Sequence, residues 1–503
     1  MNPKSQLQRV PLKELNEELD PYSRREGKRE ACGIFGIYSK IGHPVSFRIY
    51  NGLSMLQHRG QDSAGIATSN GSKIFVKTGL GLVADIFDRK AIESLIGHVG
   101  IGHTRYPTIG GCTKEDAQPQ IISSPKRGMA LAHNGNIANY SEISSELAKS
   151  GRMISSGCDA EIILHLFALE YEKTHNFFSA ARKCMEKLDG SYSAVLVSGE
   201  GDLVVFRDPY GIKPLCYGED NEKMIFASES VALDINEVEL SGYVQPGEVV
   251  VVNEHGISRK VVMPNKKPAH CMFEYVYFAR PDSILESRLV YEVRVELGRR
   301  LAEVMPVDAD AIVPVPDTAR PAAIGYSERS GIPVVEGLLK NRYIGRTFIM
   351  PSQEKRNEAV RLKLNPVRHL IKDKEIIMID DSIVRGTTCG PIVALLKKGG
   401  AKKVHVRITS PPIIAPCFYG IDLPTYSELI AANYNVAKIA KKIGADSLAY
   451  LPIDDLVSAI GLGDRLCLGC ITDKYPTKTA EKLSKKLKAH GGKLKGCRIW
   501  EGE

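Results

Sequence analysis

Apolar residues follow two different patterns along this chain. From residue 32 to about residue 260, short apolar runs of strand length alternate with Gly-rich turns. Two stretches in this part, residues 143–150 and 160–173, have helical patterns instead. The first pattern therefore predicts a layered domain that is rich in antiparallel strands.

The second pattern begins after residues 264–268, a segment of Pro, Asn and Lys with the composition of a linker. A long helical pattern at 290–305 is followed by apolar runs of strand length that alternate with helical segments. These runs are residues 311–316, 331–337, 375–380 and 403–408. Alternation of this kind predicts an α/β domain with a parallel sheet.

The two ends of the chain differ in composition from both patterns. Residues 1–31 are polar and charged, and an apolar run begins abruptly after them. Residues 474–503 contain nine Lys or Arg and three acids, so this end carries +6 of the net charge of +8. We therefore divide the chain into a leader (1–31), two domains (32–263 and 264–475) and a basic tail (476–503).

The composition is that of a protein in water, with 43% hydrophobic and 25% charged residues. The sequence contains no apolar run long enough to span a membrane and no apolar signal-peptide core near its start, and the acids among residues 1–31 argue against a transit peptide. We expect a cytoplasmic protein without a membrane partner. Leu483 and Leu487 among the lysines of the tail predict a solvated amphipathic helix or a subunit contact rather than a nucleic-acid site.

Residues 376–388, IIMIDDSIVRGTT, carry the strongest chemical signal. Four apolar residues predict a buried strand that ends at Asp380 and Asp381, and the carboxyl ends of parallel strands face the ligand crevice. Backbone amides of residues 385–388 at a helix start, together with two Thr hydroxyls, would bind a phosphate group. Adjacent carboxylates suit a sugar diol or a hydrated Mg²⁺.

This segment resembles the phosphoribosyl pyrophosphate (PRPP) signature of type I phosphoribosyltransferases. The resemblance implies that PRPP is bound by Asp380, Asp381, Ser382, Arg385, Gly386, Thr387 and Thr388. Residues 311–320 resemble the pyrophosphate loop of that family, in which Thr318 would help the two acids to hold Mg²⁺; this chain has Thr where many relatives have Ser. Residues 340–351 resemble its mobile loop, in which Lys340, Arg342 and Arg346 would neutralise pyrophosphate while the closed loop excludes water.

Cys32 opens a strand-like run, CGIFGIY, where it is either a buried structural residue or a nucleophile. As the first residue of a processed chain, its α-amine, with a pKa of about 8, would act as general base for its thiol, with a pKa of about 8.5. While residues 1–31 remain attached, this nitrogen is an amide and cannot do so. Residues 32–230 resemble the N-terminal-nucleophile glutamine amidotransferases, which implies that residues 1–31 are a propeptide removed by self-processing or by an aminopeptidase.

The same resemblance assigns roles to residues in four further motifs. Arg59, in LQHRGQDSAG, and Arg105, in GHTRYPT, would both contact the substrate, and Arg105 would bind the α-carboxylate of glutamine. Asn134 and Gly135, in HNG, would form the oxyanion hole. Asp159, in SSGCDAE, matches the acid that binds the α-ammonium group of glutamine.

The order of the two domains resembles the glutamine PRPP amidotransferase family over residues 32–480. This implies formation of 5-phosphoribosylamine, glutamate and pyrophosphate from glutamine, PRPP and water, as the first step of purine synthesis. A Cys32 thioester would release ammonia, which an internal channel would carry to the ribose. The resemblance also implies inhibition by purine nucleotides and a homo-oligomer, either a tetramer or a dimer.

Eleven cysteines in a chain without a secretory signal predict free thiols rather than a disulfide framework. Cys467 and Cys470 form a CxxC, which a helix cap or a zinc half-site would also give. The segment resembles the iron–sulfur subgroup of the same family, with Cys271 and Cys417 as the other ligands. This implies one structural 4Fe–4S cluster per subunit, beside one Mg²⁺, with a four-cysteine zinc site as the alternative. Cys389, beside the phosphate segment, is interpreted as a small loop residue.

Two other functions fit parts of the sequence. A different glutamine-dependent enzyme, such as a sugar-phosphate aminotransferase, would share the first half of the chain but not the PRPP signature. A PRPP-sensing regulator that binds nucleic acid would explain the basic tail, but the sequence contains no recognisable nucleic-acid motif. Such a regulator would have no use for Cys32, Arg105, Asn134 and Asp159 together.

Overall fold

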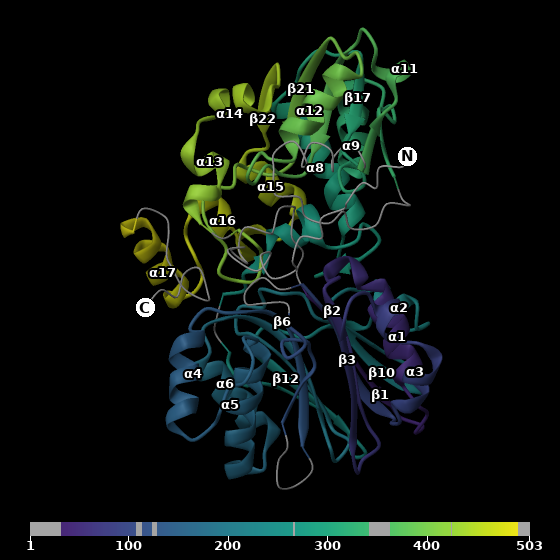
Figure 1. The fold of residues 1–503 in the computed structure, drawn as a ribbon, viewed down its shortest axis with the longest axis vertical. Helices are drawn as coiled ribbons and strands as arrows, with labels where there is room; N and C mark the ends of the chain where they lie inside the picture. The colour runs from purple at the N-terminus through teal and green to yellow at the C-terminus, as the bar shows by residue number, and fades with distance from the viewer. Residues whose placement is uncertain are drawn as a thin grey trace, which may run out of the picture.

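The computed structural model describes residues 32–106, 113–122, 128–264, 267–341, 363–423 and 425–490. Figure 1 shows two lobes along the long axis, with the purple-to-teal first half of the chain below and the green-to-yellow second half above. None of the described helices is long and apolar enough to cross a lipid bilayer.

Two antiparallel sheets form the first lobe. One has the order β11 (Gly242–Tyr243), β9 (Cys216–Glu219), β10 (Lys223–Ala227), β1 (Gly33–Ser39), β4 (Val99–Arg105), β2 (Ser63–Ser69) and β3 (Ile74–Leu80). The other has the order β13 (Gly256–Val261), β12 (Glu248–Asn253), β8 (Leu203–Arg207), β7 (Gly190–Ser198), β6 (Met129–Ile137) and β5 (Gln120–Ile122).

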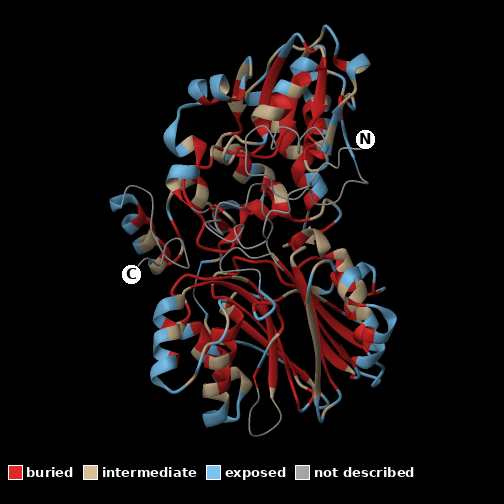
Figure 2. Cartoon of the chain, viewed as in Figure 1, coloured by how far each residue is buried: buried red, intermediate tan, exposed pale blue. Residues whose placement is uncertain are grey.

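The central strands of these sheets are buried on both faces, as the red strands in Figure 2 show, whereas the edge strands β3 and β13 are partly or fully exposed. Successive strand residues point to opposite faces. Ile34 therefore packs with Val195 of the other sheet, while its neighbour Phe35 packs with helix residues such as Leu53. Strands that are buried on both sides place the sheets in the middle of the lobe.

Helices cover the two outer faces of this sheet pair. The helices that cover the first sheet are α1 (Ser46–Met55), α2 (Val83–Ile86), α3 (Arg89–Ser94) and α7 (Val231–Asp234). Those that cover the second are α4 (Tyr140–Lys149), α5 (Asp159–Thr174) and α6 (Phe177–Lys187). The four layers have the order αββα and confirm the predicted layered domain that is rich in antiparallel strands.

A four-stranded parallel sheet lies in the second lobe, in the order β17 (Ala311–Pro314), β20 (Glu375–Asp380), β21 (Lys403–Ile408) and β22 (Ser447–Tyr450). The helices on one face are α8 (Val290–Val304), α9 (Arg320–Ser330) and α15 (Ile453–Ile460). Those on the other are α11 (Arg368–Ile371), α12 (Cys389–Lys398), α13 (Ile430–Asn433) and α14 (Val436–Ile443). This arrangement confirms the predicted α/β domain with a parallel sheet.

Short elements complete the second lobe. They are the strand pairs β14 (His270–Cys271) with β23 (Leu466–Cys467), β15 (Ile284–Leu285) with β16 (Arg288–Leu289), and β18 (Leu338–Lys340) with β19 (Leu364–Pro366), the π-helical turn η2 (Glu274–Phe278), the 3₁₀ turns η3 (Tyr426–Glu428) and η4 (Gly463–Arg465), and helices α16 (Gly469–Thr472) and α17 (Lys478–Ala489). A further 3₁₀ turn, η1 (Gln57–Arg59), lies in the first lobe.

The prediction of a strand at residues 331–337 is wrong. Only Val334 pairs there, in an isolated bridge with Ile312 beside β17. The carbonyl of Pro333 accepts a 2.8 Å hydrogen bond from Ile312, but proline has no amide hydrogen with which to continue a ladder.

The basic tail begins with a docked helix. In α17, Ala480 and Leu487 are buried, and the amide of Thr479 donates a 3.0 Å hydrogen bond to Asp189 of the first lobe. The lysines of α17 are largely exposed, so the helix is amphipathic as predicted, with its apolar side against the protein.

Candidate active sites

Cys32 directly precedes β1, the central strand of the first sheet. Its Sγ donates a 3.5 Å hydrogen bond to the carbonyl of Tyr106. Burial raises the pKa of the Cys32 thiol above its ordinary value. A thiol in this environment needs a base before it can act as a nucleophile.

Arg105 and Asp159 lie close to Cys32, as the sequence predicts. Arg105 ends β4 and is buried. Burial opposes its positive charge, yet nearby acidic groups, including Cys158, Cys32 and Asp159, raise the pKa of the Arg105 guanidinium. Asp159 begins α5, accepts a 3.1 Å hydrogen bond from the Ile137 amide and lies 2.8 Å from His133 Nε2. A guanidinium and a carboxylate, the groups that bind the two charged ends of an amino acid, therefore both lie near the thiol.

Asn134 and Gly135 lie side by side in β6. The Asn134 amide is completely buried, and neither its oxygen nor its nitrogen has a hydrogen-bond partner in the described part of the chain. Gly135 has φ of +149°, and a Cβ there would lie 2.0 Å from the Ser191 carbonyl oxygen, so only glycine fits. An unpartnered buried amide costs free energy unless a ligand or an intermediate uses it.

Arg59 forms a buried network behind Cys32. Its Nε donates a 3.0 Å hydrogen bond to the Cys32 carbonyl. Its other nitrogens bond to Glu229 at 2.6 Å and to both oxygens of Glu274 at 2.8 and 2.9 Å. With these contacts Arg59 positions the backbone of Cys32. A contact between Arg59 and the substrate stays a prediction, and the observed contacts do not favour it.

Glu229, which also bonds to Arg59, links the first lobe to the second. Its Oε2 accepts hydrogen bonds from the Arg280 amide at 2.9 Å and the Ser283 hydroxyl at 2.6 Å. Burial alone would raise the pKa of Glu229, but His58 and Arg59 lower it far below its ordinary value. The carboxylate is therefore ionised and holds the second lobe against η1.

Asp380 and Asp381 lie at the carboxyl end of β20, where the sequence places them. The hydroxyls of Thr318 and Ser382 each donate a 2.7 Å hydrogen bond to Asp381, and the Asp381 amide donates one of 2.9 Å to Asp380. Both acids are almost fully buried. Thr318, Asp380 and Asp381 thus bring together oxygen ligands of the kind that Mg²⁺ prefers.

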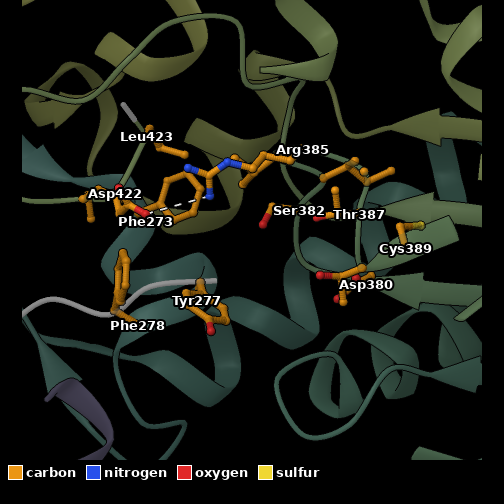
Figure 3. Close-up of a pocket in the computed structure, with 15 residues that line it drawn as sticks. Phe273, Tyr277, Phe278, Asp380, Ser382, Arg385, Thr387, Cys389, Asp422 and Leu423 are labelled. Carbon is orange, nitrogen blue, oxygen red and sulfur yellow. Dashed lines mark ion pairs between the residues drawn. The ribbon is translucent and has the colours of Figure 1, made fainter. Parts of the chain in front are cut away.

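Residues 385–388 line a pocket next to these acids, with Asp380 and Ser382 (Figure 3). Gly386 has φ of +76°, which lets the loop turn before α12 begins at Cys389. Arg385 is paired with Glu428 at 2.8 Å and lies 3.9 Å from Asp422. Backbone amides at a helix start, with two Thr hydroxyls, make this a suitable site for a phosphate group.

The residues predicted for the mobile loop are only partly described. Lys340 ends β18 and lies 2.9 Å from Asp317 Oδ2, with both side chains about half exposed. Arg342 and Arg346 lie outside the described residues.

The four predicted cluster cysteines come from three separate segments and meet between the lobes. Cys271 of β14 pairs in register with Cys467 of β23. The carbonyl of Cys470 accepts 3.0 Å hydrogen bonds from residues 414 and 415, which brings the Cys417 segment alongside. Burial raises the pKa of Cys470 far above its ordinary value, and the nearby thiols of Cys417, Cys467 and Cys271 raise it further. In the described ranges, however, no three metal-ligating side chains are spaced to hold a single metal ion.

The remaining cysteines have structural surroundings. Cys158, Cys184 and Cys216 are buried in the first lobe, and Cys389 packs in the core around the parallel sheet. Cys112 and Cys497 lie outside the described residues.

The turn η2 is the wall between the two sites. Phe273, Tyr277 and Phe278 line the pocket that contains Asp380, and Figure 3 shows their rings facing it. At the start of the turn, Glu274 instead bonds to Arg59 beside Cys32. Single π-helical turns of this kind occur frequently at functional sites.

Sequence reasoning missed three buried charged residues around this wall: Glu274, Lys213 and Arg294. Lys213 is fully buried, and its Nζ has no hydrogen-bond partner among the described residues. Arg294 donates to the carbonyls of Tyr275 at 2.9 Å and Ala279 at 2.8 Å, and burial lowers its pKa to about 10, which leaves it charged at pH 7. One feature of the sequence could have indicated these residues: Glu274 is an acid within the otherwise apolar and aromatic run CMFEYVYF.

Comparisons with known proteins agree with the two sites. A family model described as a glutamine amidotransferase domain matches residues 103–234. An amidophosphoribosyltransferase of Methanothermobacter thermautotrophicus is 48% identical over 91% of this chain and 96% of its own length, and one of Methanocaldococcus jannaschii is 46% identical over 89% and 98%. The solved structure of the glutamine PRPP amidotransferase of Bacillus subtilis, complexed with ADP and GMP, superposes with a TM-score of 0.83 and 39% identity over 89% of this chain and 98% of that one.

Proposed function

The chain belongs to the amidophosphoribosyltransferase family, and we propose that its two half-reactions use the residues described above. Its activity is the formation of 5-phosphoribosylamine, glutamate and pyrophosphate from glutamine, PRPP and water, the first step of purine biosynthesis. The main support for these residue roles is the buried side-chain amide of Asn134, which has no hydrogen-bond partner among the described residues and lies in the strand that faces the Cys32 region.

In the glutamine reaction, removal of residues 1–31 gives Cys32 a free α-amine that takes the proton of its thiol. Arg105 binds the α-carboxylate and Asp159 the α-ammonium group of glutamine. As the thiolate attacks the side-chain carbonyl, the Asn134 amide and the Gly135 N–H stabilise the oxyanion. Collapse of the intermediate expels ammonia and leaves a thioester on Cys32, which water then hydrolyses to glutamate.

In the phosphoribosyl reaction, the amides of residues 385–388 and the hydroxyls of Thr387 and Thr388 bind the 5-phosphate of PRPP. Asp380 and Asp381 accept hydrogen bonds from the ribose hydroxyls. Thr318 and the two acids form an oxygen site that fits Mg²⁺, which when bound supplies charge neutralisation for the departing pyrophosphate. Lys340, Arg342 and Arg346, in the segment that resembles the family's pyrophosphate-closing loop, neutralise the same leaving group.

We also propose that Cys271, Cys417, Cys467 and Cys470 bind a 4Fe–4S cluster that ties the two domains together. Their convergence between the lobes supports this, and a four-cysteine zinc site is the alternative. Iron and sulfide analysis of anaerobically purified protein distinguishes the two: about four of each per chain supports the cluster, and one zinc without sulfide rejects it.

We also propose control of this chain by nucleotides and its assembly into an oligomer. The Bacillus subtilis structure is of a complex with ADP and GMP, which supports purine nucleotides as inhibitors of this chain too. We propose a cytoplasmic homo-oligomer, either a dimer or a tetramer, which sedimentation would identify.

The test of the residue assignments measures glutamate and pyrophosphate together, from glutamine, PRPP and Mg²⁺, in wild type and Cys32→Ala. We expect one-to-one release in the wild type. In the variant, only pyrophosphate release that depends on added ammonia should survive. Intact mass should show that the active chain begins at Cys32; an active enzyme that retains residues 1–31 would refute the proposed base.

A further inference from the structure

Gln118 lies between two parts of the proposed glutamine site. Its side chain is almost fully buried, and its amide group bonds in two directions. The oxygen Oε1 accepts a 2.8 Å hydrogen bond from the backbone amide of His133 in β6. The nitrogen Nε2 donates a 3.3 Å hydrogen bond to Sγ of Cys158, the residue before α5. One buried side chain therefore joins the strand of the proposed oxyanion groups to the helix that begins with Asp159.

The sequence around Gln118 explains why a side chain makes this link. The strand β5 pairs with β6 as far as Gln120, which lies opposite Leu131. In the same register Gln118 would lie opposite His133, but Pro119 comes between and has no amide hydrogen with which to continue the ladder. The amide of His133 therefore bonds to the side chain of Gln118 instead of to a strand carbonyl.

Asp159 is bonded to the same strand at two points. Its Oδ1 lies 2.8 Å from His133 Nε2, and its Oδ2 accepts a 3.1 Å hydrogen bond from the Ile137 amide. Asn134 and Gly135 lie between these two points. The position of Asp159 along this stretch therefore sets the distance from its carboxylate to the oxyanion groups. This distance matters because a misplacement of about 1 Å can lower a rate by about 10²-fold.

The segment that carries Gln118 is itself held on two sides. Asp116 Oδ1 accepts a 2.9 Å hydrogen bond from the amide of Gly157, just before α5. On the side of the first sheet, a Cβ at Gly65 of β2 would lie 2.2 Å from the carbonyl oxygen of Gln118, so the two backbones are in close contact. Gln118 thus acts from a fixed position between the two sheets and α5.

We propose that Gln118 is a positioning and specificity-determining residue of the glutamine reaction, which sets the distance between the α-ammonium site and the oxyanion site. It acts through the backbone of His133 and the thiol of Cys158 rather than by a contact of its own with the substrate. This inference rests on the proposed roles of Asp159 and Asn134. Its consequence is selectivity: hydrolysis is fast only when the ammonium group and the side-chain carbonyl of the substrate are separated as they are in glutamine.

The test compares L-glutamine with 5-amino-5-oxopentanoate, which is glutamine without its α-amino group and has no use for Asp159. Hydrolysis of both is measured with PRPP and Mg²⁺ in processed, full-length wild type and Gln118→Leu. Ammonia-dependent phosphoribosylamine formation and thermal unfolding are measured separately. Asn139→Leu is the matched control, because Asn139 is also a buried amide that bonds in two directions, to the Asp189 amide at 2.8 Å and the Lys187 carbonyl at 2.9 Å.

In wild type we expect kcat/KM for glutamine to exceed that for the analogue at least about 10²-fold. In Gln118→Leu this ratio should fall at least about 10-fold, through a higher KM for glutamine. Because β6 stays paired with β7, hydrolysis of the analogue and the ammonia-dependent rate should stay within about 3-fold of wild type. Asn139→Leu should keep the wild-type ratio.

Cys158 provides an independent pair of variants at the other end of the link. Burial raises the pKa of its thiol to about 12, so the sulfur is a neutral acceptor at pH 7. Cys158→Ser keeps an acceptor for Gln118 and should keep the wild-type ratio, whereas Cys158→Ala removes it and should lower the ratio about 3-fold or more. Both substitutions are small, so they test the proposal even if Gln118→Leu does not fold.

Three results would overturn the proposal. The first is an unchanged ratio in Gln118→Leu, or in Cys158→Ala if Gln118→Leu does not fold. The second is a parallel loss of glutamine hydrolysis and analogue hydrolysis in these variants, which would make Gln118 a general structural residue. The third is a wild type that does not distinguish glutamine from the analogue. Only this third result would also refute the proposed role of Asp159.

Discussion

The side-chain amide of Asn136 donates a 2.8 Å hydrogen bond to the carbonyl of Phe418, 282 positions later in the chain. Asn136 is two residues after the proposed oxyanion amide in β6, and Phe418 directly follows a proposed cluster cysteine. The neighbouring Ser191 hydroxyl makes a similar 2.9 Å bond to the Tyr419 carbonyl. The strand that carries the proposed oxyanion amide is therefore hydrogen-bonded to the segment that carries a proposed cluster ligand.

We predict that Asn136→Ala impairs the glutamine reaction specifically. The substitution removes a buried hydrogen bond between the two lobes, at a cost of about 0.5–1.5 kcal/mol. Asn236→Ala removes a comparable buried bond of 2.9 Å to the Ala232 carbonyl within one lobe. Urea unfolding should show similar losses for both variants, whereas only Asn136→Ala should lower glutamine-dependent activity. Equal activities in the two variants would mean that the contact is not needed to shape β6.

Asn134→Ala should lower kcat for glutamine by about 10²–10³-fold, because one oxyanion donor is lost. KM for glutamine and ammonia-dependent synthesis should stay close to wild type. Steady-state kinetics with glutamine and with ammonium chloride measure both. A fall in the two activities by the same factor would show that Asn134 supports folding rather than the oxyanion.

Thr318→Val should weaken Mg²⁺-dependent use of PRPP. Valine keeps the shape of threonine but removes the hydroxyl that lies 2.7 Å from Asp381. We expect KM for PRPP to rise roughly 10-fold at limiting Mg²⁺, equal to about 1.4 kcal/mol of lost binding. Thr68→Val, which removes a hydroxyl from β2, is the control. Identical Mg²⁺ titrations of the two variants would remove Thr318 from the metal site.

Glu161→Gln should destabilise the loop before Asp159 in a pH-dependent way. Burial alone would raise the pKa of Glu161, but hydrogen bonds from His165, Ser155 and Ser156 lower it from 4.5 to about 2. A depressed carboxylate pKa stabilises the fold above pH 4.5, and the contribution is lost as pH falls toward 2. The free energy of unfolding of the wild type should exceed that of Glu161→Gln by roughly 1–3 kcal/mol at pH 7. At pH 4 this difference should be smaller by about 0.8 kcal/mol.

Urea unfolding of both proteins at pH 7 and pH 4 measures this change. The exposed Glu254 provides the control variant Glu254→Gln, for which no such change is expected. A gap that is the same at the two pH values would contradict the ionised, hydrogen-bonded state of Glu161.

Local sequence patterns predicted those site residues whose position is set by a single strand or helix. Asp380 ends an apolar strand, and the loop at 385–388 precedes a helix. The spacing of the apolar residues and the residue types of the loop therefore place the two together. The pattern around Cys32 likewise predicted a strand with the cysteine at its start. The error at residues 331–337 arose because two valines suggested a strand while Pro333 allowed only a single bridge.

Contacts between distant segments could not be predicted in this way. Nothing in the sequence around Arg59 indicates that it meets Glu274, 215 positions away, or that Lys213 lies beside the pair. Such contacts depend on how the two lobes dock. The motif of Arg59 correctly marked it as important, but only the structure shows that it bonds to buried carboxylates.

The close contact at Gly420 limits how this enzyme could be recombined with others. A Cβ at Gly420 would lie 2.9 Å from the carbonyl oxygen of Gly135, so the backbones of the two lobes pack without side chains between them. A chimera that joins this amidotransferase domain to the phosphoribosyl half of another enzyme would therefore clash at this point unless that half also has glycine here. Residues 418–420 and β6 act as one unit of exchange, because each fixes the backbone space that the other can occupy.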